Sequence, residues 1–424
     1  MIRHWTWTSA DLDAEYIPGS NNSRNKTGTI PTEETAMKKA HIPIALTALT
    51  LSATLVPPSL AEEVTLPPSM VWSAYDLGSS GYAEASGIAN ALQQTHKTRI
   101  RIVPAGTSIG RMLPMLTDKV RYGFLANEAF FAAEGLFDFG VPSWGPQDIR
   151  IVLGRPASGG LAVANDIGVK AMSDLKGKRI GYVKGNPSVN IKNDAYIAFG
   201  GLTRKDVQVV WFGSYNAMKD AIVANQLDAM ASVTTSANMR QIEASPRGLT
   251  WPAFEPGNKK GWSALTKIVS FAGPFKETVG AAISKDKPVD LILFRYPMIT
   301  TYAKTPVDEV YNLVKAIDEA YDVFKNTTGS SANWEVKRSG VPPADAPFHD
   351  GIIKYAKEKG FWTAEHQAWQ DERLARLKMV RAAWEKATGE FKKIAADKAE
   401  KKEQFDSEKE WLAFWESYRA QHLN

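Results

Sequence analysis

The sequence predicts an α/β fold in which sheets of mainly parallel strands are flanked by helices. Short runs rich in β-branched and aromatic residues alternate with segments whose apolar residues recur every three or four positions. This alternation is typical of parallel strands joined by right-handed crossovers. With 424 residues, of which 44% are hydrophobic, the chain can bury a large core and form about two domains.

The expected elements follow from these two periodicities. We expect strands at Met70–Ala74, Thr98–Val103, Arg121–Leu125, Ile149–Leu153, Gly160–Ala164, Arg179–Val183, Val207–Phe212 and Asp228–Ser232. We expect amphipathic helices at Gly81–Gln94, Ile109–Leu116, Val189–Phe199 and Asn216–Asn225.

The start of the chain divides into two unlike segments. Residues 1–36 are polar, and we expect them to be a non-native or disordered leader. Residues 37–61 have the pattern of a signal peptide, with Lys38 and Lys39 before an apolar stretch that is too short to span a bilayer as a helix. Cleavage after Ala61 would release a mature protein into the periplasm. The alternatives are a genuine long leader and an anchor that stays attached.

Composition argues against several classes of site. The chain has no cysteine, which excludes disulfides, thiolate nucleophiles, cysteine-bound zinc and a lipid anchor on an N-terminal cysteine. Its 51 basic and 46 acidic residues are interspersed, so no basic face for nucleic acid is expected. The histidines form no i,i+4 pair, and no phosphate-binding loop motif occurs. We therefore expect no metal and no cofactor.

Four loops that follow expected strands are rich in small hydroxyl and amide residues, namely 75–82, 104–110, 184–190 and 232–236. In parallel sheets, ligands bind beyond the carboxyl ends of the strands. Glycines there allow close approach, and the free N–H groups of the next helix favour an anion such as a carboxylate. The alternative for any single loop is helix capping and turn formation. Together the loops predict one shared cleft.

Several motifs resemble those of a known family. Ser173–Gly181, which reads Ser-Asp-Leu-Lys-Gly-Lys-Arg-Ile-Gly, resembles a signature of type II periplasmic binding proteins, and Ala221–Ala229 resembles a later element of the same proteins. Asn127–Gly135 and Pro347–Gly360, with the order of the other motifs, resemble the TAXI branch of the solute-binding proteins of TRAP transporters. The resemblance extends from about Val71 to about Phe361.

The resemblance implies a two-lobed type II periplasmic-binding-protein fold with two crossovers that form a hinge. Lobe one would comprise residues 64–158 and 275–375, lobe two residues 159–274, and residues 376–424 a C-terminal helical tail. The implied function is capture of a small organic acid, glutamate-like or a keto- or dicarboxylic acid, for a TRAP-type membrane permease, without catalysis. The alternative of the same fold is a binding protein of an ABC transporter.

The loops and the resemblance together nominate ligand-binding residues. These are Tyr75, Ser79, Ser80, Tyr82, Thr107, Ser108, Asn127, Asn186, Ser188, Asn190, Thr234 and Thr235. The family commonly has a Ser-Gly-Ser-Gly-Thr loop where this chain has Gly185–Asn190, so the resemblance does not fix glutamate as its ligand. Candidate charged partners for an acid are Lys184, Arg155 and Arg111.

An enzymatic alternative rests on residues 106–110, which form a Gly-x-Ser-x-Gly turn between a strand and a helix, as in serine hydrolases. His349 and His366 follow in the required order, but Pro104 and Pro114 flank the turn unfavourably. We expect His349 instead to cap a helix or bond to backbone in lobe one.

The C-terminal sixty residues read as helices. Residues 364–403 have helical spacing, and Ser407–Glu410 form an expected capping box ahead of several aromatic residues. We expect this tail to pack on lobe one. The alternative is a contact with a second copy of the chain, forming a dimer, or with the permease.

Overall fold

The computed structural model describes residues 63–403 and 406–423, so the expected leader and signal peptide lie outside the described residues. Its strands are β1 (Ser69–Tyr75), β2 (Arg99–Ala105), β3 (Tyr122–Leu125), β4 (Ile149–Ala164), β5 (Arg179–Val183), β6 (Gln208–Phe212), β7 (Ala229–Val233), β8 (Leu249–Thr250), β9 (Gly273–Glu277) and β10 (Val289–Tyr302). Its helices are α1 (Ser80–His96), α2 (Ser108–Leu116), α3 (Glu128–Glu134), α4 (Pro187–Phe199), α5 (Tyr215–Val223), α6 (Ala237–Ala244), α7 (Lys259–Ile268), α8 (Val307–Glu319), α9 (Tyr321–Phe324), α10 (Val336–Ser339), α11 (Asp350–Glu358), α12 (Ala364–Glu400) and α13 (Ser407–His422). None of the described helices is long and apolar enough to cross a membrane.

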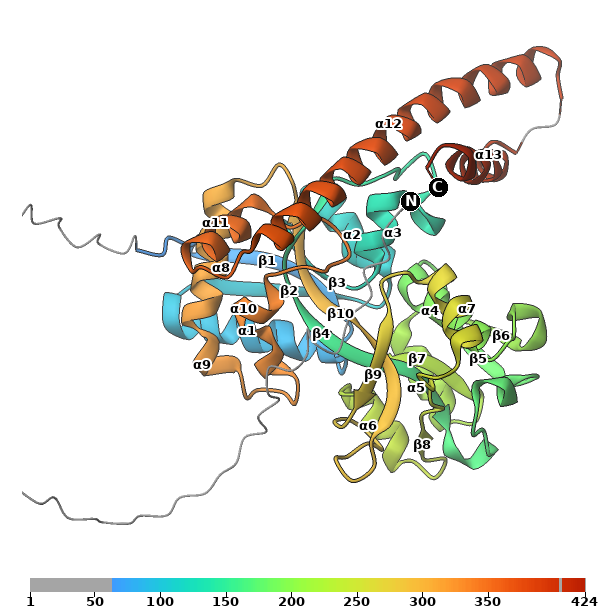
Figure 1. Cartoon of the computed structure of the whole chain (residues 1–424), viewed down its shortest axis with the longest axis horizontal. Coiled ribbons are helices and arrows are strands. Elements are labelled where there is room, and N and C mark those ends of the chain that lie inside the picture. Colours follow the sequence, from blue (N-terminus) through green and yellow to red (C-terminus); the bar gives the residue numbers. More distant parts are fainter. Residues whose placement is uncertain (1–62, 404–405, 424) are drawn as a thin grey trace, which may run out of the picture. The chain divides into compact units, whose positions relative to one another are not determined.

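Two long antiparallel strands, β4 and β10, connect the two halves of the molecule (Figure 1). The strand order is β2-β1-β3-β10-β4-β7-β5-β6. We call the half that contains β1–β3 lobe one and the half that contains β5–β7 lobe two. In lobe one the order β2-β1-β3 continues into β10, and in lobe two the order β6-β5-β7 continues into β4. The two halves thus repeat one arrangement, with parallel strands and one long antiparallel neighbour.

This is the predicted α/β fold, the two-lobed type II periplasmic-binding-protein arrangement with helices on its mixed sheet and a C-terminal helical extension. The chain passes between lobes within β4 and again within β10, because both strands pair with elements of each half. The exact lobe borders after residues 158 and 274 remain predictions.

Strand β4 differs from the expectation of two separate strands at Ile149–Leu153 and Gly160–Ala164. The intervening Gly154 and Pro156 suggested a break, since proline lacks the N–H that a strand ladder needs. In the structure Pro156 lies opposite Arg295, next to a register shift between Arg295 and Met298 of β10. A bulge of this kind tolerates an unpaired position, so the strand continues through the proline.

A buried ion-pair network fixes β4 against lobe one. Glu84 of α1 accepts hydrogen bonds from Nε and Nη2 of Arg155, at 2.5 and 2.6 Å. It also accepts from Ser330 Oγ at 2.9 Å and from Trp334 Nε1 at 2.6 Å. Glu84 and Arg155 are each 1% exposed. Because all four bonds converge on one carboxylate, the buried charge is well compensated.

The C-terminal tail folds back on its own chain. Helix α12 extends away from the rest of the molecule, and α13 returns toward α3 (Figure 1). The indoles of Trp411 and Trp415 donate to the carbonyl oxygens of Gly140 and Gly135, each at 2.7 Å. These contacts agree with the expected packing on lobe one. The cap of α13 is Asp406, which accepts from the Lys409 amide, so the expected capping box starting at Ser407 is wrong by one residue.

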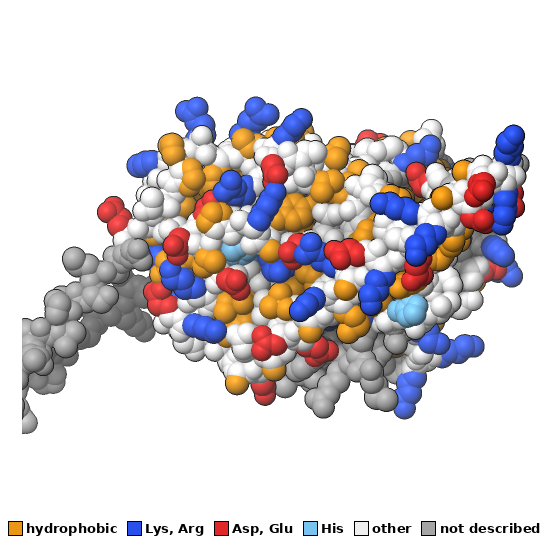
Figure 2. Space-filling view, turned by 90° about the horizontal axis from the view of Figure 1, so that it is seen from above, with side chains coloured by type: hydrophobic (Ala, Val, Ile, Leu, Met, Phe, Trp, Pro, Cys, Tyr) orange, Lys and Arg blue, Asp and Glu red, His pale blue; other side chains and the backbone are white. Residues whose placement is uncertain are grey.

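The surface shows no large region of one charge on the face drawn in Figure 2. Lys and Arg side chains alternate there with Asp and Glu side chains, and apolar side chains lie between them. Positive charge is therefore not gathered in one region of this face.

Candidate functional site

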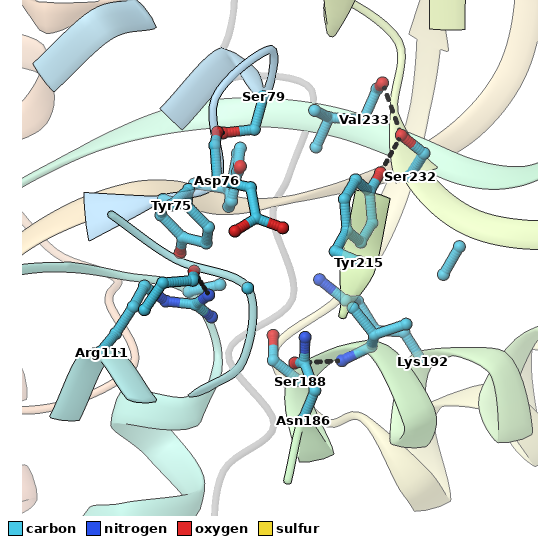
Figure 3. A pocket seen from close by; sticks show the side chains of 16 residues that line it. Tyr75, Asp76, Ser79, Arg111, Asn186, Ser188, Lys192, Tyr215, Ser232 and Val233 are labelled. Carbon is cyan, nitrogen blue, oxygen red and sulfur yellow. Dashed lines mark hydrogen bonds between the residues drawn. The ribbon is translucent and has the colours of Figure 1, made fainter. Parts of the chain in front are cut away.

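A pocket lies where the loops of lobe one face those of lobe two (Figure 3). The empty space within the pocket and at its mouth, open solvent included, amounts to about 520 Å³. Its walls are the loop after β1, the end of β2, the first turns of α2 and α4, the start of α5, and parts of β7 and β10. The lining residues are Tyr75, Asp76, Ser79, Ala105, Gly106, Arg111, Ala126, Asn186, Ser188, Val189, Lys192, Tyr215, Ala231, Ser232, Val233 and Tyr296.

Arg111 forms one wall and is already paired. Its Nε and Nη2 donate to Oε1 of Glu128 at 3.0 and 2.6 Å, and its guanidinium lies 3.9 Å from the centre of the Tyr75 ring. Both charged groups are buried, Arg111 at 2% and Glu128 at 0% exposure. Burial raises the pKa of Tyr75 well above its usual value, so its hydroxyl stays protonated. That hydroxyl has no hydrogen-bond partner among the described residues.

Lys192 brings a second cation to the pocket from helix α4. The residue is 7% exposed, and its ammonium lies 4.5 Å from the centre of the Phe294 ring. Within the described residues it has no ion pair and no hydrogen bond. Burial lowers its pKa to about 8, while Glu128 and Asp345 act in the opposite direction. The ammonium is therefore mainly charged at neutral pH and lacks a direct anionic partner.

Helix α4 also begins at the pocket. Asn186 caps it by accepting from the Val189 amide, Pro187 occupies its first turn, and Ser188 follows. Proline at this position is favoured because the first amides of a helix have no partner inside it. The positive end of a 13-residue helix and the Lys192 ammonium thus face the same space.

Asp76 lies on the lobe-one side of the pocket. Figure 3 shows its carboxylate directed into the space between Arg111 and Tyr215. The side chain is half-buried, and burial raises its pKa, against a hydrogen bond from the Asn216 backbone and the charge of Arg111. A Cβ atom added to Gly106 would lie 2.7 Å from an Asp76 oxygen. Glycine at position 106 therefore makes room for this carboxylate.

Direct contacts join the lobes around the pocket. Ser108 Oγ donates to Oδ1 of Asn186 at 2.8 Å, and the Ile109 amide donates to the Gly185 carbonyl at 3.1 Å. The Asn216 side chain donates to the Leu77 carbonyl at 3.0 Å. Because each bond crosses from one lobe to the other, the structure corresponds to a closed arrangement of the lobes.

Five of the nominated residues line the pocket, namely Tyr75, Ser79, Arg111, Asn186 and Ser188. Ser79 and Thr107 cap α1 and α2 by accepting from the amides of Tyr82 and Gly110. Ser108 does not line the pocket, but it donates a hydrogen bond to Asn186, which does. Ser80 is buried in the first turn of α1 and Tyr82 is partly buried there, but neither lines the pocket.

The other nominated residues have partners elsewhere. Asn127 donates to Asp345 at 2.7 Å, and Asn190 bonds twice to the Val183 backbone. Thr234 contacts Glu277, and Thr235 contacts Ser330. Of the candidate cations, Lys184 is exposed and Arg155 is held by Glu84. These side chains lie around the pocket rather than on its walls.

Sequence reasoning missed Asp76, Lys192, Tyr215, Ser232 and Tyr296. Asp76 and Ser232 belong to loops that were recognised, but a carboxylate was not considered as a partner for an acidic ligand. Helix α4 is buried along most of its length, so its periodicity does not single out Lys192. Tyr296 comes from β10, a strand that was not expected.

The serine-hydrolase alternative finds no support in this geometry. Ser108 is buried, and its hydroxyl is bonded to Asn186 rather than to a histidine. His349 caps α11 by accepting from the Gly351 amide at 3.1 Å, and its other nitrogen lies 3.0 Å from the Thr305 carbonyl oxygen. The expected capping role of His349 is confirmed. His366 accepts from the Thr363 amide at the start of α12.

The described residues contain no group of three or more histidine, aspartate or glutamate side chains arranged to hold a metal ion.

Comparisons with known proteins found similar solved structures and one matching family model. Similar solved structures include the alkanesulfonate-binding protein SsuA from Xanthomonas axonopodis pv. citri bound to MOPS, at 15% identity over 70% of this chain and 92% of that one, with a TM-score of 0.37. Another is R. palustris Rpa4515 with adipate, at 13% identity over 60% of this chain and 82% of that one, with a TM-score of 0.41. No curated protein matches the sequence.

The model of one protein family matches residues 147–360, which is just over half of the chain and runs from the start of β4 through α11. By this match the chain belongs to the NMT1-like family.

Proposed function

We propose that this protein is a periplasmic solute receptor that closes its two lobes around a small organic acid. The observation that carries this proposal is the Lys192 ammonium, which is buried at the pocket, has no ion pair among the described residues, and lies on the same helix whose N-terminus opens there. A buried cation without a partner is costly, and an acid that enters the pocket relieves that cost. The NMT1-like family membership and the two-lobed fold support the same role.

Lobe closure follows from how the pocket is divided. Lobe one supplies Tyr75, Ser79 and Arg111, and lobe two supplies Asn186, Ser188 and Lys192. In an open arrangement water would solvate both sets, whereas in the closed one both contact the ligand. The ligand therefore favours closure through the contacts that it makes only in the closed state. A dissociation constant of about 1 μM, near −8 kcal/mol, is the expected order of affinity.

The acid is delivered to a membrane permease. We propose a TRAP-type permease, on the strength of the motif order that resembles the TAXI branch, and an ABC transporter is the alternative of the same fold. The signal-peptide pattern of residues 37–61 supports export to the periplasm. Uptake reconstituted in vesicles distinguishes the two kinds of transporter, since a TRAP permease needs an ion gradient and an ABC transporter needs ATP.

A thermal-shift screen of amino acids, keto acids, dicarboxylates, aromatic acids and sulfonates tests the proposal. A ligand at one hundred times its dissociation constant adds about 2.7 kcal/mol to the free energy of unfolding. The acids that stabilise wild type are then tested on Lys192→Met, and they should not raise its melting temperature. Acids that stabilise wild type and Lys192→Met equally, or no stabilising acid at all, would contradict the proposed site.

A further inference from the structure

The pocket presents charges of both signs, which bears on what kind of acid it accepts. Its lining includes one carboxylate, Asp76, and two cations, Arg111 and Lys192. Arg111 is neutralised by Glu128, with its Nη2 2.6 Å from Oε1. This leaves Asp76 and Lys192 as two opposite charges, each without an ion-pair partner within 4.0 Å among the described residues.

These two groups enter the pocket from different lobes. Asp76 belongs to the loop after β1 in lobe one, and Lys192 belongs to α4 in lobe two. In Figure 3 the side chains of Tyr75, Arg111 and Asp76 lie on one side of the space, and those of Tyr215 and Lys192 lie on the other. A ligand in this space therefore meets a carboxylate on one side and an ammonium on the other.

Charge balance then restricts the ligand. Asp76, Glu128, Arg111 and Lys192 sum to zero net charge, because two are acidic and two are basic. The buried Asp345, whose charge also acts on Lys192, adds negative charge when it is ionised. A ligand of net charge −1 or −2 would leave uncompensated negative charge in a largely buried site, with Asp76 facing it. A ligand that carries both an anionic group and an ammonium is neutral overall, and it pairs both unpartnered groups at once.

We propose that the ligand is a zwitterion, whose anionic group binds Lys192 and the N-terminus of α4 and whose ammonium binds Asp76. This inference rests on the proposed function and narrows it, since it excludes simple dicarboxylates and keto acids as preferred ligands. It assigns Asp76 as the residue that distinguishes an amino-bearing acid from the same acid without its amino group. Glycine at position 106 leaves room for the Asp76 carboxylate, since an added Cβ would lie 2.7 Å from one of its oxygens.

Matched ligand pairs that differ in one ammonium test this inference. The probes are 4-aminobutanoate with butanoate, taurine with ethanesulfonate, and L-phenylalanine with 3-phenylpropanoate, each titrated calorimetrically into the full mature chain; the first member of each pair is a zwitterion of zero net charge. We expect the ammonium-bearing member of at least one pair to bind at least tenfold more tightly than its partner. Asp76→Asn should weaken the binding of that member about tenfold or more. In this variant the dissociation constants of the two members of each pair should differ by less than threefold.

Two controls keep the outcomes distinct. Asp286→Asn removes a carboxylate from the exposed loop before β10 and should change neither affinity nor discrimination. Lys192→Met should weaken both members of a pair. If both members bind equally in wild type, or if Asp76→Asn keeps the discrimination, the zwitterion inference fails while the proposed receptor function stands. If no acid binds in a Lys192-dependent way, the proposed function fails as well.

Discussion

The hydroxyl of Ser108 in lobe one donates a hydrogen bond to the side-chain carbonyl of Asn186 in lobe two, with 2.8 Å between the two oxygens. Ser108 begins helix α2 and Asn186 caps helix α4, so one bond joins two helix N-termini across the ligand pocket. The bond exists only when the lobes are closed. It therefore contributes to the stability of the closed state independently of any ligand.

Replacing Ser108 by alanine should weaken ligand binding about fivefold, since one net hydrogen bond contributes about 1 kcal/mol. The effect comes from a less stable closed state, because Ser108 does not line the pocket itself. Calorimetric titration of Ser108→Ala with the best acid from the screen measures it. Ser143→Ala, at an exposed position of lobe one, is the matched control and should bind as wild type does. An unchanged affinity in Ser108→Ala would show that this bond does not support closure.

A methyl group at position 106 should keep the lobes apart. The Cβ of Gly106→Ala would lie 2.8 Å from the Cβ of Ser214 in lobe two, besides its contact with Asp76. Because real Cβ atoms do not approach so closely, the lobes must separate, and we expect at least a tenfold loss of affinity. Small-angle scattering should give a larger radius of gyration than wild type. Gly213→Ala, one residue before Ser214, meets no atom within 4 Å and should change neither quantity.

The network around Glu84 should dominate the stability of lobe one near the hinge. Glu84→Gln leaves Arg155 buried and without its counter-charge, which costs about 3–5 kcal/mol in the free energy of unfolding. Urea unfolding monitored by tryptophan fluorescence measures the change. Glu255→Gln, on an exposed loop, removes a carboxylate with little expected effect. A loss below about 1 kcal/mol for Glu84→Gln would contradict the role given to this network.

Replacing Lys192 should weaken ligand binding but increase the stability of the unliganded fold. Burial lowers the pKa of this lysine from 10.5 to about 8, so between these pH values the unfolded chain binds more protons than the folded one. The lysine therefore destabilises the unliganded fold at pH 7, and stability rises as pH increases from about 8 toward 10.5. Lys192→Met should raise the free energy of unfolding at pH 7 by about 3 kcal/mol.

The same lysine predicts how affinity depends on pH. An anionic ligand pairs with the charged form, so affinity should fall about tenfold per pH unit above pH 8. Titrations at pH 7, 8, 9 and 9.5 with wild type and Lys192→Met measure this, with an acid that has no amino group so that only the protein titrates, and the mutant should show no such decline. A wild-type affinity that stays constant up to pH 9.5 would mean that the ligand does not bind the ammonium.

The C-terminal tail, residues 376–424, should contribute to the stability of lobe one because it packs on that lobe. Trp415 is 1% exposed and bonded to the Gly135 carbonyl, so Trp415→Ala should cost about 3–5 kcal/mol in the free energy of unfolding. Trp211→Ala, at a position with 48% exposure, should cost less. Light scattering before and after deletion of residues 404–424 tests the alternative of a dimer through the tail. A wild-type dimer that becomes a monomer on deletion would favour that alternative.

Much of the fold was predictable because its signals are local. The strands and helices from β1 to β7 follow from periodicity and loop composition, with two exceptions: helix α3 was not expected, and two expected strands merge into β4. That merging depends on a bulge in β10, a strand far away in the sequence, and no local pattern around Pro156 reports it. The cap of α13 shifted by one residue because Asp406 and Ser407 are both good capping residues.

The site was predictable only in outline. Residues of all four polar loops line the pocket between the lobes, among them Tyr75, Ser79, Asn186 and Ser188, while their binding of a ligand stays a prediction. Lys192 was not recognised because a lysine within a helix is usually solvated, and its burial depends on how α4 packs against both lobes. Asp76 was not nominated, because the sequence does not distinguish a carboxylate that faces a ligand from one that faces solvent. Only the tertiary structure places both residues in the same pocket, so the sequence alone does not identify them as candidate ligand-binding residues.

Titration of the strongest acid from the screen into wild type, Lys192→Met and Lys285→Met tests the central claim most directly. Lys285 lies on an exposed loop and serves as a lysine control remote from the pocket. The predicted result is a dissociation constant raised at least a hundredfold in Lys192→Met and unchanged in Lys285→Met. Equal dissociation constants in all three proteins would contradict a binding site at Lys192.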